Sequence, residues 1–202
     1  MSPELSSGAD AGPAARGPRW LARLLLPVAA VLALHAGWMP AKAALAQHLL
    51  GEAWEQARGD GGAHRPWPWA DTHPVARLSA PRLGRSQIVL AGDAGRPLAF
   101  GPGWAEASAA PGTTGTTVIS GHRDSHFEWL RELQHGDVVE LEAASGISRW
   151  TVAGSEVVDS RTTRLDVTAA ADRLVLVTCW PFDAVAAGGP MRYVVTLEPQ
   201  PE

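Results

Sequence analysis

The sequence predicts a mainly β fold, a closed or nearly closed barrel of short strands with few helices. In four segments apolar and polar residues alternate, which is typical of strands that bury one face. Residues 174–177 are apolar throughout, as in a strand buried on both faces. The segments expected to form strands are 75–80, 88–90, 116–120, 139–143, 149–152, 174–177 and 192–197. Because helical pieces are expected beside them only at 104–109 and 127–133, these strands indicate a barrel.

Composition leaves room for one folded domain and argues against one class of partner. About 130 residues from position 72 onward can bury a core without disulfides or metal ions. The net charge of the 202-residue chain is −4, and no basic stripe is present. Nucleic acid is therefore not expected as the main partner.

Residues 20–39 are almost wholly apolar and predict a transmembrane anchor. As a helix, Trp20–Trp38 would span about 28 Å, close to the hydrocarbon thickness of a bilayer. Basic residues are concentrated before the apolar core rather than after it: Arg16, Arg19 and Arg23 against Lys42. By the positive-inside rule we expect the N-terminus in the cytoplasm and the rest of the chain on the outer, extracytoplasmic side of the cytoplasmic membrane.

A cleaved signal peptide is the alternative interpretation of this segment. The small-residue triplets at 41–43 (Ala-Lys-Ala) and 44–46 (Ala-Leu-Ala) resemble cleavage sites. The length of the apolar stretch and the tryptophans at its ends favour the uncleaved anchor. Either interpretation exports the remainder of the chain.

Three further segments complete the expected organisation. Residues 1–19 are rich in Ala, Gly, Pro and Ser and predict a disordered cytoplasmic tail. Residues 40–71 predict an amphipathic helix over 41–58, with Leu45, Leu49 and Leu50 on its apolar side, and then a Pro/Trp-rich linker. The glycines of 59–62 are expected to end that helix. Residues 72–202 are expected to form the functional domain.

Cys179 is the single cysteine of the chain, and it directly follows the buried run 174–177 and Thr178. An exported protein that used cysteine for stability would need a pair. One leftover thiol indicates a reactive group or an intermolecular bond. The alternative is a small buried hydrophobe, as free cysteine often is.

His122 and Arg192 are the residues expected to act with this thiol. If the strands that end at Cys179 and begin near Arg192 pair antiparallel, the loop 180–191 brings these two residues face to face. His122 follows the strand 116–120 and can reach the same rim. A thiolate is a competent nucleophile, a histidine can protonate a leaving amine, and an arginine can hold an oxyanion.

A metal site is a second interpretation of the histidines. His122 and His126 have a four-residue spacing that would suit metal binding on a helix. Gly121 and the preceding strand argue against a helix there, and no acidic or cysteine partner completes a ligand set nearby. We therefore expect neither a metal nor a cofactor.

The residues around these positions resemble the sortases, cysteine transpeptidases of bacterial surfaces. The family motif Thr-Leu-x-Thr-Cys is matched by Val175-Leu176-Val177-Thr178-Cys179, with Val175 in place of the first threonine. The family's histidine and arginine correspond to His122 and Arg192. The strings 120–127 (SGHRDSHF) and 178–184 (TCWPFDA) look most like the sortase subgroup of Gram-negative bacteria. The resemblance covers residues 75–197.

The resemblance implies an eight-stranded sortase β-barrel as the catalytic domain, 72–202, with no cofactor. Cys179 would attack a C-terminal sorting signal similar to Leu-Pro-x-Thr-Gly in a partner protein and form a thioester, which an unidentified amine acceptor would resolve. His122 would act as general acid and base, and Arg192 would orient the substrate and stabilise the oxyanion. Thr178, Ser120 and Trp180 would support the site or contact the substrate.

Two alternatives stay open at this point. One is another exported cysteine peptidase or an L,D-transpeptidase, although that group usually carries histidine and glycine immediately before the cysteine, where this chain has Val177 and Thr178. The other is a membrane-tethered β-barrel binding module in which Cys179 is buried and inert.

Overall fold

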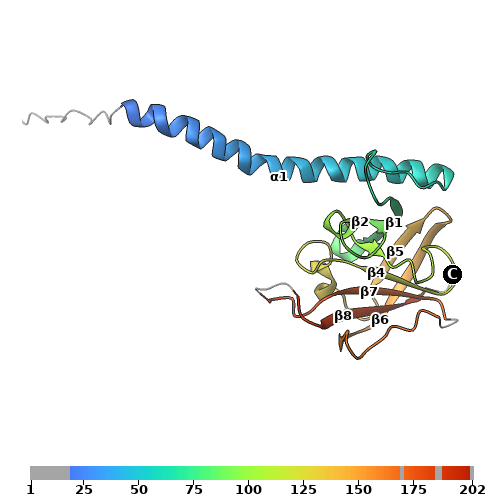
Figure 1. Cartoon of the computed structure of the whole chain (residues 1–202). Helices are drawn as coiled ribbons and strands as arrows, with labels where there is room; N and C mark the ends of the chain where they lie inside the picture. Colours follow the sequence, from blue (N-terminus) through green and yellow to red (C-terminus); the bar gives the residue numbers. More distant parts are fainter. Residues whose placement is uncertain (1–18, 169–170, 185–187, 201–202) are drawn as a thin grey trace, which may run out of the picture. The chain divides into compact units, whose positions relative to one another are not determined.

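The computed structural model describes residues 19–168, 171–184 and 188–200 (Figure 1). The predicted tail, 1–19, lies outside the described residues except for Arg19. The chain divides into two compact units, Met1–Lys42 and Ala43–Glu202. Helix α1, Arg19–Asp60, begins in the first unit and ends in the second.

In the first unit, α1 carries the predicted anchor segment 20–39. Several large apolar side chains of this part are exposed: Leu25, Leu26, Val28, Leu32 and Trp38. Among the described residues, no helix combines the length and the apolarity that a membrane crossing requires.

In the second unit, the last part of α1 confirms the helix predicted over 41–58. It ends at Asp60, and Gly61 follows with φ 70°, a left-handed conformation that glycine adopts without strain. The buried face agrees with the expected one in part: Leu50 is fully buried and Leu49 is partly buried, whereas Leu45 is 57% exposed. The buried side chains are spaced as one helical face: Leu50, Ala53, Trp54 and Ala57.

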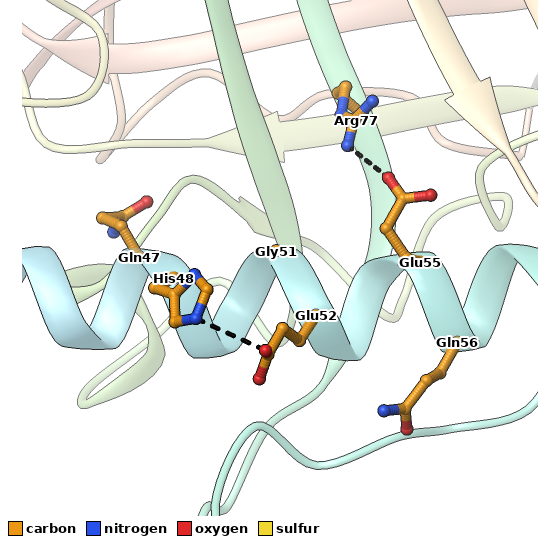
Figure 2. Close-up of a pocket in the computed structure, with 7 residues that line it drawn as sticks. All are labelled: Gln47, His48, Gly51, Glu52, Glu55, Gln56 and Arg77. Atoms are coloured by element: carbon orange, nitrogen blue, oxygen red, sulfur yellow. Dashed lines mark hydrogen bonds and ion pairs between the residues drawn. The ribbon is translucent and has the colours of Figure 1, made fainter.

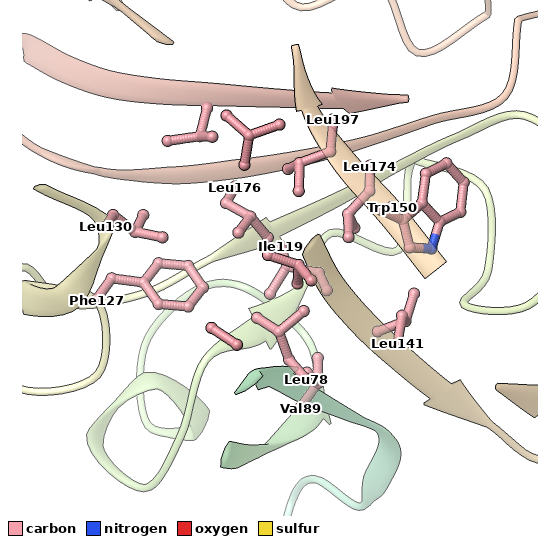
Figure 3. Packing of buried hydrophobic residues seen from close by; sticks show 14 of the residues in the cluster. Leu78, Val89, Ile119, Phe127, Leu130, Leu141, Trp150, Leu174, Leu176 and Leu197 are labelled. Carbon is pink, nitrogen blue, oxygen red and sulfur yellow. The ribbon is translucent and has the colours of Figure 1, made fainter. Parts of the chain in front are cut away.

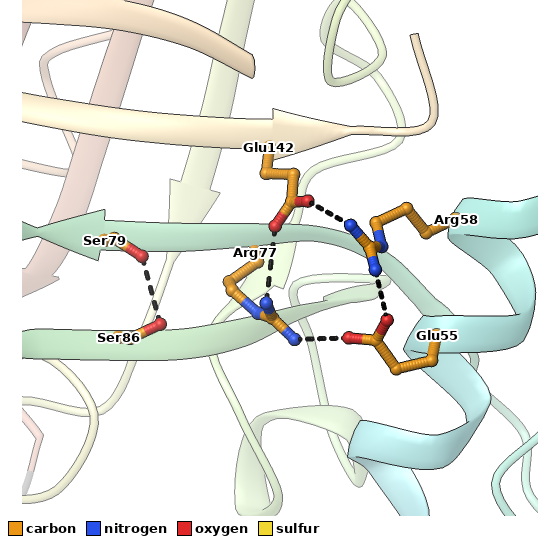
Figure 4. Close-up of polar contacts among 6 residues, drawn as sticks. All are labelled: Glu55, Arg58, Arg77, Ser79, Ser86 and Glu142. Carbon is orange, nitrogen blue, oxygen red and sulfur yellow. Dashed lines mark hydrogen bonds and ion pairs between the residues drawn. The ribbon is translucent and has the colours of Figure 1, made fainter. Parts of the chain in front are cut away.

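Polar contacts accompany this apolar face. Gln47 Nε2 donates to the Phe100 carbonyl at 2.7 Å. Glu55 and Arg58 of α1 form an ion-pair network with Arg77 of strand β1 (Pro74–Ala80) and Glu142 of strand β5 (Val138–Ala143), as Figure 4 shows. The side chains of this network are half-exposed to partly buried, from 50% for Arg58 to 16% for Glu142. Solvent screens such pairs in part, so we expect the buried apolar face to contribute most of the stabilisation.

Beside this network, α1 borders an open surface hollow of about 730 Å³ (Figure 2). Its lining is mostly polar: Gln47, His48, Gly51, Glu52, Glu55, Gln56 and Arg77. His48 and Glu52 form an exposed pair at 3.3 Å. None of the predicted site residues lines this hollow.

The predicted barrel is confirmed. Within the described residues, eight strands close in the order β1-β2-β3-β4-β7-β8-β6-β5. Besides β1 and β5, they are β2 Arg85–Ala91, β3 Gly103–Trp104, β4 Thr116–Ser120, β6 Gly146–Asp159, β7 Arg173–Cys179 and β8 Met191–Pro199. The pairs β2/β3 and β4/β7 are parallel, and the other neighbours are antiparallel.

One predicted helix is wrong and one is confirmed as a short 3₁₀ helix. Instead of a helix over 104–109, Trp104 ends β3 and a turn follows, in which the Ser108 amide donates to Ala105 O at 2.8 Å. Two residues are too few to show alternation, so the sequence did not reveal β3. Helix η3, Glu128–Glu132, lies within the predicted 127–133. The further 3₁₀ helices are η1, Pro81–Leu83, and η2, Pro97–Ala99.

The barrel interior is packed with aliphatic and aromatic side chains from alternate strand positions (Figure 3). Leu174 and Leu176 of β7 belong to this core. Val175, between them, packs with Val118 of β4 and Val194 of β8 in a second apolar cluster. Because successive strand residues point to opposite faces, β7 is buried on both sides, as its sequence predicted.

Candidate active site

Strands β4 and β7 bring two predicted site segments to one rim of the barrel. They are parallel neighbours, with Ser120 opposite Val177. Parallel strands end at the same edge of a sheet. Cys179 is the last residue of β7, and His122 lies two residues beyond the end of β4. Both residues therefore lie at that rim.

Arg192 lies at the same rim through the neighbouring pair of strands. β7 and β8 pair antiparallel with Cys179 directly opposite Arg192, which confirms the pairing inferred from the loop between them. The Arg192 guanidinium donates from Nη1 to Gly189 O at 2.8 Å and to Met191 O at 2.9 Å. The loop backbone before β8 thus helps to fix this side chain.

Gly121 connects the histidine loop to the cysteine strand. Its amide donates to Val177 O at 3.0 Å, and its carbonyl accepts a 2.7 Å hydrogen bond from Thr178 Oγ1. A Cβ at position 121 would come within 2.8 Å of the Phe127 ring, which is fully buried. Glycine at this position therefore lets the loop pack closely against the core.

His122 follows as an exposed residue at the start of a tight turn. Its carbonyl accepts the amides of His126 at 3.1 Å and Phe127 at 3.0 Å. The segment is a turn rather than a helix. The four-residue spacing of His122 and His126 therefore does not put the two residues on one face of a helix, as the metal-site interpretation would require. Burial lowers the pKa of His126, and the nearby His122 adds to that effect.

Cys179 and His122 line a common hollow of about 240 Å³. The other lining residues are Arg123, Asp124, Ser125 and Gly188. The cysteine is a free thiol and is partly exposed. This is not the position of a cysteine enclosed in apolar packing, which the binding-module alternative requires.

A second hollow, of about 520 Å³, lies over the second apolar cluster, to which Val118 and Val194 belong. Its apolar wall consists of Val118, Val158, Leu165, Val167, Val177 and Val194. Ser120 and Arg192 also line it, and Ser120 Oγ donates to Asp93 Oδ2 at 3.4 Å. Arg192 lines this hollow, and its strand partner Cys179 lines the smaller one.

Trp180 begins the loop after the cysteine and packs among aromatic rings. It stacks on Tyr193 with ring centroids 5.7 Å apart and meets Phe182 edge-on at 5.6 Å. Tyr193 and Phe182 also pack against the barrel core. These contacts attach the start of the loop to the barrel.

Comparison with known proteins agrees with this architecture. The family model for the sortase domain matches residues 78–200, which is more than half of the chain. The chain belongs to the sortase family. The predicted family resemblance is thereby confirmed, and its finer assignment to a Gram-negative subgroup stays a prediction.

The relatives of this sortase domain are distant. Sortase D of Bacillus subtilis (strain 168) is 29% identical over 119 residues, which are 58% of this chain and 60% of that protein. Sortase A from Corynebacterium diphtheriae has a similar structure, with a TM-score of 0.59 and 25% identity over 66% of this chain and 64% of that one. The chain thus spans less than two thirds of both relatives.

Another solved sortase shows the fold alone. The Group B Streptococcus Pilus Island 1 sortase C2 has a TM-score of 0.57 and 21% identity, over 63% of this chain and 74% of its own. The barrel is therefore retained across sortases whose sequences differ at most positions.

Arg123 is a residue of this candidate site that sequence reasoning missed. It is only 4% exposed, although its neighbours His122 and Asp124 are exposed. Its Nη2 donates to Asp124 Oδ2 at 2.9 Å and to Ala184 O at 3.1 Å, and its Nη1 donates to Pro181 O. Arginine is abundant in the chain, so its position beside His122 was the one available signal.

The Arg123–Asp124 pair shifts both pKa values in the expected sense. Hydrogen bonds from Arg123 hold the pKa of Asp124 below its usual range. The Asp124 carboxylate raises the pKa of Arg123, and the nearby Cys179 and Asp183 act in the same direction. Among the described residues, no group of three or more His, Cys, Asp or Glu side chains is placed to hold a metal ion.

Proposed function

We propose that this sortase is a membrane-anchored cysteine transpeptidase that acts on a C-terminal sorting signal similar to Leu-Pro-x-Thr-Gly. The supporting observation is that Cys179 and His122 line one hollow at the barrel rim, beside Arg192, the strand partner of Cys179. A nucleophile and a general acid–base residue together at an accessible rim suit acyl transfer.

In the first half-reaction, the Cys179 thiolate attacks the threonine carbonyl carbon of the sorting signal. The carbonyl becomes an oxyanion, which the positive charge of Arg192 stabilises. When the tetrahedral intermediate collapses, the Thr–Gly bond breaks. The leaving glycine amine takes a proton from His122, and the threonine remains joined to the sulfur as a thioester.

In the second half-reaction, an amine attacks the thioester carbonyl and gives a proton to His122. The C–S bond breaks and the thiolate of Cys179 is regenerated. The loop that begins directly after Cys179 carries the apolar rings of Trp180 and Phe182. Exclusion of water by this loop would favour the amine over hydrolysis of the thioester.

The 520 Å³ hollow is the proposed binding site for the apolar part of the sorting signal. Its valine-rich wall suits leucine and proline side chains, because contact with it removes their apolar surface from water. Ser120 and Arg192, at its polar side, are the proposed contacts to the peptide backbone. Thr178 is proposed to support the histidine loop through its bond to Gly121.

The membrane location rests on the sequence. We propose that residues 20–39 anchor the chain in the cytoplasmic membrane, with the N-terminus in the cytoplasm and the barrel on the periplasmic side. The protein substrate would then be encountered during or after its own export. Glycosylation of an introduced acceptor site or protease protection in sealed vesicles would test this orientation.

The enzymatic proposal is tested by incubating the full-length chain in mild detergent with a Leu-Pro-Glu-Thr-Gly peptide and triglycine. Mass spectrometry should detect the threonyl–triglycine product with the wild type and no product with Cys179→Ala. Without triglycine, hydrolysed peptide or an enzyme adduct is expected. No turnover across a panel of related peptides would contradict the proposal.

A thiol-labelling experiment separates the alternatives. A catalytic Cys179 should react promptly with iodoacetamide at neutral pH, and His122→Ala should change that rate. Slow labelling that is insensitive to His122 would favour the non-catalytic binding module. Cleavage of peptidoglycan stem peptides instead of sorting peptides would favour an L,D-transpeptidase.

A further inference from the structure

Arg123 joins two loops that are distant in the sequence. It belongs to the turn after β4, next to His122, and is paired there with Asp124. Its other acceptors, Pro181 O and Ala184 O, lie 58 and 61 residues further along, in the loop after β7. One buried guanidinium therefore fastens the histidine loop to the loop that begins directly after Cys179.

The geometry requires a guanidinium. Arginine presents several N–H donors in a planar fork, and here the fork serves one carboxylate and two backbone carbonyls. A lysine ammonium at this position would keep the charge, but it would not reproduce the planar set of donors. An apolar side chain would leave both carbonyls without this donor.

The charge of Arg123 also lies near the sulfur. Arg123 and Cys179 line the same hollow, and their charges interact electrostatically. A fixed positive charge near a cysteine favours its thiolate form. Arg192, the second arginine at this rim, donates to Gly189 O and Met191 O.

We propose that Arg123 is a positioning residue, which holds the cysteine and histidine loops in register and keeps a permanent positive charge near the Cys179 sulfur. The proposal rests on the proposed transpeptidase function. It assigns Arg123 no contact with the substrate. Its loss should therefore reduce kcat while the KM for the sorting peptide, set by the apolar hollow, stays nearly constant.

Arg82 provides a matched control. Its guanidinium also binds one carboxylate through two nitrogens, Nε to Asp137 Oδ1 and Nη2 to Asp137 Oδ2, both at 2.6 Å. Its Nη2 also donates to the carbonyl of Glu132, the last residue of η3, at 2.6 Å, although Arg82 is more exposed than Arg123. It lines neither hollow of the site, so Arg82→Met removes a comparable clamp away from the chemistry.

The test compares Arg123→Met, Arg123→Lys and Arg82→Met in the full-length chain. Circular dichroism and thermal unfolding check folding, peptide turnover gives kcat and KM, and iodoacetamide alkylation at pH 7 gives thiolate reactivity. Arg123→Met should lower kcat about 100-fold, as expected for a small misplacement of reacting groups. It should also slow alkylation about tenfold through loss of the charge.

Arg123→Lys separates the two effects. It should lower kcat strongly because the loop carbonyls lose their planar donor, yet alkylate at nearly the wild-type rate because the charge remains. Arg82→Met should shift thermal unfolding without changing kcat or alkylation.

Two results would overturn the proposal. One is a kcat for Arg123→Met equal to that of Arg82→Met; should Arg123→Met fail to fold, a wild-type kcat for Arg123→Lys has the same meaning. The other is alkylation of Arg123→Met as fast as that of the wild type. If wild-type enzyme turns over no peptide, the proposed function fails, and the alkylation comparison still decides whether Arg123 acts on Cys179.

Discussion

Thr178 and Gly121 are joined by a 2.7 Å hydrogen bond from Oγ1 to the carbonyl oxygen, which ties the residue before Cys179 to the residue before His122. The Gly121 amide completes the connection by donating to Val177 O. The relative position of the thiol and the imidazole thus depends on groups one residue before each of them. This hydrogen bond explains a threonine before the cysteine without giving that threonine a part in the reaction.

Thr178→Val should therefore weaken both the fold and the chemistry. The side chain is 2% exposed, so its loss leaves a buried carbonyl without this donor, at a cost of about 1–3 kcal/mol. Urea unfolding measures this cost, and peptide turnover should fall as well. Thr72→Val is the control, because Thr72 is 3% exposed and donates to Ala91 O at the same 2.7 Å. It should lose similar stability and keep kcat, and a wild-type kcat in Thr178→Val would contradict the coupling.

Gly121→Ala should displace the histidine loop. The added Cβ would lie 2.8 Å from Phe127 Cδ2, and overpacking of this kind costs about 1–3 kcal/mol. Gly154→Ala, on β6, adds a Cβ that meets nothing within 4 Å and should change stability by less than about 0.5 kcal/mol. Thermal unfolding and peptide turnover of both variants test this, and equal effects would refute the steric argument.

Arg192→Lys should impair acyl transfer more than it impairs folding. Arg192 is fixed by two backbone carbonyls and carries a planar donor set that an ammonium cannot reproduce. Loss of one oxyanion-stabilising group typically costs about 100-fold or more in kcat. Single-turnover acylation by the sorting peptide measures this loss, with unchanged thermal unfolding as the folding control. A kcat near that of the wild type would remove Arg192 from the proposed mechanism.

Trp54→Ala should destabilise the barrel unit strongly, because this helix side chain is 1% exposed. Truncating a buried tryptophan costs about 3–5 kcal/mol. Arg77→Met, which removes a member of the partly exposed ion-pair network in Figure 4, should cost less. Urea unfolding of the two variants compares the contributions, and equal losses would contradict the dominance of the apolar face.

A truncated chain beginning at residue 72 would lose the whole buried face of the helix and is expected to be less stable than one beginning at 43.

The contribution of Asp159 to the stability of the fold should be lost at acid pH. Hydrogen bonds from Arg161 lower the pKa of Asp159, at the end of β6, from its ordinary 3.8 to about 2. A carboxyl with a lowered folded-state pKa stabilises the fold fully above its unfolded value, and this contribution disappears as the pH falls toward the folded value. Asp159→Asn should thus be less stable than the wild type at pH 5. That difference should shrink as the pH falls from about 4 to about 2 and disappear below the folded-state pKa, as thermal unfolding across this range can measure. A difference as large at pH 2 as at pH 5 would argue against the pair.

Periodicity along the chain determined much of the fold. Alternation and apolar runs located all strands except β3, which is only two residues long, and the glycines of 59–62 located the end of α1. The pattern failed at 104–109 because a turn stabilised by Ser108 leaves no periodic trace. On the helix, it identified the amphipathic segment and the side that includes Leu50, but not that Leu45 stays exposed, since this depends on what packs against each turn.

The sequence by itself determined the family, the strands and the three residues proposed for the chemistry, because a lone cysteine, a histidine after a strand and an arginine at a strand start are local features. Only the tertiary structure decided that Arg123 is buried and bonded to carbonyls beyond Cys179, and that Thr178 is bonded to Gly121. The physical reason is that these contacts arise from the parallel pairing of β4 with β7. That pairing joins residues nearly 60 positions apart, and no short-range pattern records it.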